Sequence, residues 1–160
     1  MPVNHEKIIP KSDIPQEMPQ GLSVKYEVTA FGDAKEITEE SLSQLVKKIH
    51  NGEKLGIYLS SDPYLEEDYM QIEIDHGLIM LQYVKNDGLK DGCFYVSFDP
   101  EYLDSKEESP MECSDGQSVI LMRYTMRNPE SAAKCVEYFV RTGKLYSGMD
   151  WLKGWTEWEE

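Results

Sequence analysis

Acidic residues gather in two stretches of this sequence, and tyrosines accompany both. Residues 62–75 contain six carboxylates and no lysine or arginine, while residues 99–115 contain seven carboxylates and one lysine. Carboxylates steer a cationic partner, and tyrosines supply rigid contact area. We therefore predict an acidic binding face for a basic protein, formed by Glu66, Glu67, Asp68, Asp99, Glu101, Asp104, Glu107 and Glu108. On charge alone, a merely solvated acidic surface explains such clusters more often.

Catalytic motifs are absent from the sequence. It has no HExxH, Walker loop, GxGxxG or GxSxG. His5, His50 and His76 lie far apart, and none stands in a recognisable context with a cysteine or serine. We predict that the protein is not an enzyme and has no catalytic residues, no cofactor and no metal site. An enzyme with a histidine beside Cys93 or Cys113 in space remains an alternative.

The overall charge restricts the partners that the chain can attract. Thirty acidic and 16 basic residues give a net charge of −14 over 160 residues. Such a field opposes nucleic acid and anionic membranes and attracts basic proteins. No apolar run approaches the roughly 20 residues of a membrane helix, and the N-terminus lacks the order of a signal peptide. We therefore expect a cytoplasmic protein with neither a nucleic-acid nor a membrane partner.

The most legible element is a helix over residues 129–142. Asn128 suits its N-cap, Pro129 its first position and Gly143 its left-handed end. Its apolar residues follow the spacing of one buried stripe, which predicts Cys135 as a core residue. The stripe consists of Ala132, Cys135, Val136, Phe139 and Val140. A second helix is predicted from Thr38 to His50. Its third position is Ser41 and not glutamate or glutamine, so we predict that Thr38 and Ser41 do not form a capping box.

Runs rich in apolar and β-branched residues, bounded by residues typical of turns, predict strands. These runs are residues 22–30, 55–59, 69–75, 78–84, 93–98 and 118–125. Four prolines in residues 1–21 oppose helix and sheet pairing, so we predict a proline-rich flexible lead-in there. Gly154 opposes a helix around Trp151 and Trp155, so we expect an aromatic tail that packs on the sheet. Residues 22–160 are then a single α+β domain: a mainly antiparallel sheet with two principal helices packed on it.

The order of these features resembles an immunity-protein family of bacterial polymorphic toxin systems, the first-numbered one of that catalogue. The likeness covers roughly Val24 to Trp151 and includes the run 118–124, the helix 129–141 with Thr142-Gly143 after it, and Trp151. It implies a small cytoplasmic α+β protein that binds a cognate toxin domain, often a nuclease or deaminase. It implies no catalytic residues and a structural role for Trp151. Residues before Val24 and after Trp151 depart from the pattern.

Charge and resemblance favour the same function. We expect an immunity protein that neutralises a basic toxin acting on nucleic acid by occluding the toxin's active surface. One alternative is an acidic nucleic-acid mimic that inhibits DNA-binding proteins generally. The other is an enzyme with an unrecognised site.

Overall fold

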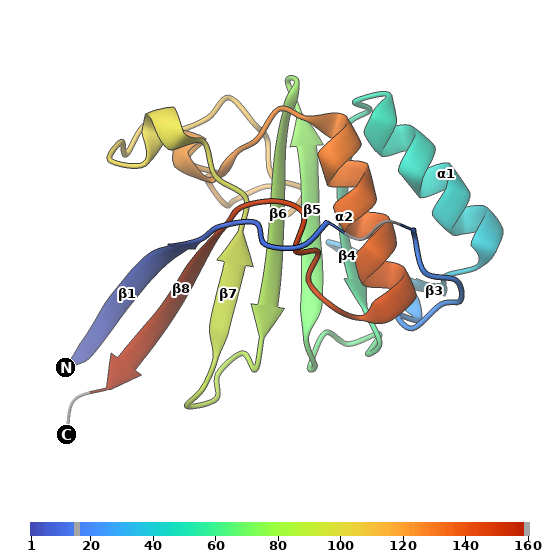
Figure 1. Ribbon diagram of the computed structural model, residues 1–160, viewed down its shortest axis with the longest axis horizontal. Coiled ribbons are helices and arrows are strands. Elements are labelled where there is room, and N and C mark those ends of the chain that lie inside the picture. Colours follow the sequence, from blue (N-terminus) through green and yellow to red (C-terminus); the bar gives the residue numbers. More distant parts are fainter. Residues whose placement is uncertain (15–16, 159–160) are drawn as a thin grey trace.

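A single antiparallel sheet with helices on one face forms the protein. The computed structural model describes residues 1–14 and 17–158, and its strands are ordered β1-β8-β7-β6-β5-β4-β2-β3 (Figure 1). The predicted α+β class is confirmed. The elements are β1 (Pro2–Ile9), β2 (Tyr26–Thr29), β3 (Ala34–Glu36), α1 (Glu39–His50), β4 (Leu55–Ser60), β5 (Tyr69–Asp75), β6 (Leu78–Lys85), β7 (Cys93–Val96), α2 (Pro129–Thr142) and β8 (Trp151–Trp158).

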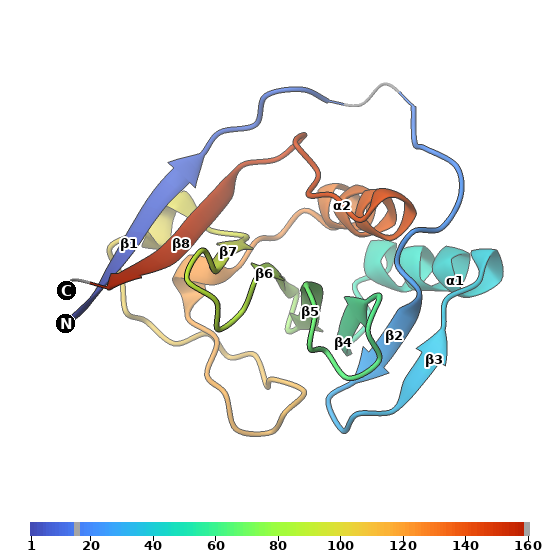
Figure 2. The same cartoon turned by 90° about the horizontal axis from the view of Figure 1, so that it is seen from below.

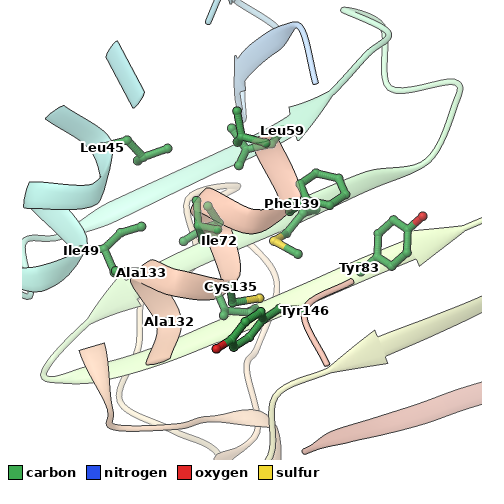
Figure 3. Close-up of a cluster of buried hydrophobic side chains, with 14 of the residues drawn as sticks. Leu45, Ile49, Leu59, Ile72, Tyr83, Ala132, Ala133, Cys135, Phe139 and Tyr146 are labelled. Atoms are coloured by element: carbon green, nitrogen blue, oxygen red, sulfur yellow. The ribbon is translucent and has the colours of Figure 1, made fainter. Parts of the chain in front are cut away.

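Both helices pack on the same face of the sheet and bury their apolar stripes there (Figures 1 and 3). The predicted stripe of α2 is confirmed, because all five of its residues are buried. Cys135 is fully buried, and burial raises the pKa of its thiol far above the ordinary value. The helices meet the sheet at Leu59, Ile72 and Tyr83, where the close-up shows side chains of both helices and of the sheet together.

The ends of the helices follow from side-chain capping. Asn128 Oδ1 accepts a hydrogen bond from the Ser131 amide at 3.1 Å, and Gly143 ends α2 with φ of 72°. Our prediction about Ser41 was wrong. The Thr38 hydroxyl accepts from the Ser41 amide at 3.0 Å, and the Ser41 hydroxyl accepts from the Thr38 amide at 2.8 Å. A short serine therefore completes the capping box that usually uses glutamate or glutamine.

The opposite face of the sheet is covered by the long segment between β7 and α2 (Figure 2). The strand predicted over residues 118–125 was wrong, since this run forms a 3-10 helix (Met122–Tyr124) and one isolated bridge, Glu108 to Leu121. Ile120 and Met122 are buried against the sheet. The apolar run predicts burial correctly, but it covers the sheet instead of joining it.

The N-terminal lead-in was predicted wrongly for residues 2–9, which form the edge strand β1. All eight of its residues pair with β8. Pro2 begins the strand and Pro10 follows it, so neither proline removes a donor from the middle of the ladder. The segments that depart from the immunity-family pattern at the two ends of the chain thus pair with each other.

The aromatic tail forms β8, which lies between β1 and β7. Trp151 is 1% exposed, and its indole N–H donates to the Tyr146 carbonyl at 2.8 Å. Gly154 lies opposite Phe94, and a Cβ added to Gly154 would come within 2.1 Å of the Phe94 ring. The aromatic ring therefore occupies the space above the glycine, which holds the register of β7 and β8.

Replacing Gly154 with alanine tests this packing. We expect Gly154→Ala to lower the free energy of unfolding by about 1–3 kcal/mol, because the Phe94 ring must move. Urea unfolding measures the change. In Gly154→Ala/Phe94→Leu the added methyl no longer meets a ring, so the loss should be smaller than the sum of the two single losses. Strict additivity would contradict the proposed contact.

Candidate partner-binding site

The predicted binding residues of the two acidic stretches lie at opposite ends of the sheet. Residues 62–68 lead into β5, whose first residue, Tyr69, pairs with Val84 near the end of β6. Residues 99–115 follow β7 beyond Val96, which pairs with Gln82 further back along β6. The eight predicted residues therefore do not form one face. The structure brings Glu66, Glu67 and Asp68 together and places the other five at the far end.

The first group lines a hollow of about 490 Å³ between the β4–β5 loop, the β6–β7 loop and the end of α2. Tyr83 and Phe139 lie at its base but are only 8% and 2% exposed, so its accessible apolar surface comes mainly from Leu89. No lysine or arginine is among the described residues that line it. Its carboxylates belong to Glu66, Glu67, Asp68 and Asp87. A hollow lined by several carboxylates without a lysine or arginine beside them suits the side chain of a basic residue.

Asp68 connects the two loops that border the hollow. Its carboxylate accepts hydrogen bonds from the Asn86 amide at 2.8 Å and from the Tyr83 hydroxyl at 3.4 Å. Burial, followed by the charge of Asp68, raises the pKa of Tyr83 to about 12, so the phenol stays a donor at neutral pH. Asp68 thus joins the β4–β5 and β6–β7 loops. Of the three residues at this end, Glu66 and Glu67 are exposed and Asp68 is half-buried.

The β6–β7 loop contributes site residues that the sequence analysis did not assign. Asp87 and Leu89 line the hollow, and Leu89 is 65% exposed. The sequence Asn86-Asp87-Gly88 indicates a turn at this point. It does not indicate which other loop the turn lies beside. Only the pairing of β5 with β6 and of β6 with β7 brings this loop beside residues 66–68.

The second group is largely free of internal ion pairs. Asp99 accepts from the Glu101 amide at 3.0 Å and caps a 3-10 helix (Pro100–Tyr102). Glu101, Asp104, Glu107 and Glu108 are exposed. In the described part of the chain, no lysine or arginine nitrogen lies within 4.0 Å of any of the eight predicted carboxylates.

Two carboxylates from the first acidic stretch hold the long loop against the sheet. Glu73 is 1% exposed, and it accepts hydrogen bonds from the Ser114 amide and, at 2.7 Å, from the Ser114 hydroxyl. Asp75 accepts from the Glu112 amide at 2.8 Å. This amide, followed by His76 and Lys54, keeps the pKa of Asp75 below its ordinary value. These two residues are therefore structural, although the sequence grouped them with the exposed carboxylates.

The described thiols show no nucleophile–base arrangement. Cys113 borders a hollow of about 310 Å³ and Cys93 one of about 410 Å³, and no histidine is among the described residues lining either. Burial raises the pKa of Cys113 to about 11, so its thiol is protonated at neutral pH. Over residues 1–14 and 17–158, no group of three or more His, Cys, Asp or Glu side chains is arranged to hold a metal ion.

Comparisons with models of known protein families, with curated proteins and with solved structures return no match. None of the helices described here has the length and apolar character needed to cross a membrane.

Replacing Asp75 with asparagine tests the attachment of the long loop. The carboxylate's folded-state pKa is lowered, so its stabilisation is present above its ordinary pKa and is lost as the pH falls through the lower folded value. We expect Asp75→Asn to be less stable than the wild type at pH 7, with the gap narrowing below about pH 4. Urea unfolding from pH 7 to pH 2 measures the gap.

The control for this experiment is Asp104→Asn, which changes an exposed carboxylate at the same end of the sheet. We expect this variant to follow the wild type across the same pH range. A gap for Asp75→Asn that stays constant from pH 7 to pH 2 would show that the charge of Asp75 does not hold the loop.

Proposed function

We propose that this chain is a cytoplasmic immunity protein that binds a basic toxin domain acting on nucleic acid and neutralises it by occluding its active surface. The observation that carries the proposal is the hollow of about 490 Å³ with carboxylates of Glu66, Glu67 and Asp87 and no described cationic lining residue. Toxins that act on nucleic acid need a cationic substrate surface. A compact acidic surface is complementary to it.

Unpaired carboxylates give this surface its steering power. Glu66 and Glu67 are exposed, and neither forms an ion pair within the described residues. Their charge is therefore available to a partner. Electrostatic steering of this kind raises association rates to as much as about 10⁸–10⁹ M⁻¹s⁻¹ at low salt.

Binding of one cognate partner is favoured over general mimicry of nucleic acid. The carboxylates of the hollow stand beside Leu89, an apolar side chain that is 65% exposed. Lys90 follows on the same loop and breaks the run of negative charge. A mixed surface with apolar contacts discriminates among basic proteins by shape, whereas a uniform row of charges would not.

The sequence resemblance supports the same conclusion. It points independently to a protein that neutralises a toxin and predicts no chemistry of its own.

Neutralising two carboxylates of the hollow tests the proposal. We expect the gene beside this one to encode a large secreted protein, and the partner for the test is the purified C-terminal domain of that protein. We expect Glu66→Gln/Glu67→Gln to lower the association rate by about tenfold at low salt, because two steering charges are lost. Stopped-flow or biolayer measurements at increasing salt should show the two rates converging.

The matched control is Glu36→Gln/Glu40→Gln, which removes the same charge from exposed positions on β3 and α1. This variant should associate nearly as fast as the wild type. Equal slowing by both pairs would assign the effect to net charge and refute a localised site. Comparable binding to several unrelated basic proteins would favour the mimic instead.

A further inference from the structure

The β6–β7 loop, residues 86–92, stands between two hollows at one end of the sheet. The acidic hollow lies on one side, with Asp87 and Leu89 in its wall. A second hollow, of about 460 Å³, also has Asp87 and Leu89 in its wall, and it lies on the other face of the sheet, because Gln82 and Val84 line it where Tyr83 lines the acidic hollow. Figure 1 shows the loop reaching beyond the ends of the neighbouring strands. The loop is thus a ridge with free space on both flanks.

Hydrogen bonds within the loop hold it in a compact shape. The Leu89 amide donates to the Asn86 carbonyl, and the Gly92 amide donates to the Leu89 carbonyl, both at 3.0 Å. The Asn86 side chain donates to Asp91 at 3.1 Å, and Asp68 accepts the Asn86 amide. A Cβ on Gly92 would lie 2.5 Å from the Asn86 carbonyl oxygen, so the closure requires glycine. The loop is therefore organised before any partner arrives.

The loop presents one large apolar side chain between two carboxylates. Leu89 is 65% exposed, and Asp87 and Asp91 are both exposed. An exposed leucine alone is ordinary on a protein surface. Here, however, the leucine is displayed by a closed loop, and ordering a preformed loop adds little to the entropic cost of binding.

We propose that residues 86–92 enter the active-site cleft of the basic toxin domain and that Leu89 is the main apolar contact there. This inference rests on the proposed function and specifies how the active surface is blocked. A convex ridge is complementary to a cleft, and the hollows beside it leave room for the cleft's two rims. The acidic hollow receives a cationic rim, while Asp87 and Asp91 face cationic side chains that would otherwise hold a phosphate.

Truncating Leu89 tests the insertion. With the same purified toxin domain, we expect Leu89→Ala to raise the dissociation rate by about tenfold or more, since buried apolar contacts at an interface control dissociation. The association rate should change less than twofold, because no charge is altered. The melting temperature should stay the same, since the side chain is exposed.

Val119→Ala is the matched control, because Val119 is 58% exposed on the long loop that covers the other face of the sheet. It should dissociate like the wild type. If Leu89→Ala also dissociates like the wild type while Glu66→Gln/Glu67→Gln slows association, loop insertion is refuted and the proposed function stands. If the wild type does not bind the toxin domain at all, both fail.

A photo-cross-link locates the loop in the complex. With p-benzoylphenylalanine in place of Leu89, we expect cross-links to residues that line the toxin's active-site cleft, identified by mass spectrometry. The same group in place of Val119 should give none there. Cross-links from position 89 that map to the toxin surface away from its active site would overturn the inference.

Discussion

The fold depends on covering both faces of its two central strands. The face of β5 and β6 that carries Ile72 and Leu81 is buried along nearly its whole length, and their other face is buried at Glu73, Leu78 and Met80 and half-buried elsewhere. α1 and α2 cover one face, and the long segment between β7 and α2 covers the other (Figure 2). Because that segment has little regular structure, side chains must hold it in place, and Glu73 and Asp75 accept its amides.

Because the helices cover one face of the sheet and the long segment covers the other, the predicted binding carboxylates lie in the loops at the ends of the sheet. Turns between antiparallel strands gather there, so residues distant in sequence become neighbours, as Asp68 and Asn86 show. One end combines carboxylates, the exposed Leu89 and a closed loop, and the other carries Glu101, Asp104, Glu107 and Glu108. The first end has the features of a binding surface, whereas the second has charge alone.

The acidic residues of this protein serve two purposes. Asp68, Glu73, Asp75 and Asp99 accept backbone amides and fix loops, as carboxylates do where the backbone lacks other partners. Glu66, Glu67 and Asp87 make no ion pair in the described structure and remain free to attract a cation. A net charge of −14 therefore overstates the part available for steering.

Local patterns in the sequence determined α2 with its caps, the hairpin of β5 and β6, and the buried Cys135, because spacing and turn residues act over a few positions. They did not determine that the run 118–125 covers the sheet. Apolar residues predict burial equally well for a strand that pairs within a sheet and for a segment that packs on its face. Nor did they reveal β1, whose only partner, β8, lies at the other end of the chain. The tertiary structure alone decided which carboxylates meet, because strand pairing sets the distance between loops.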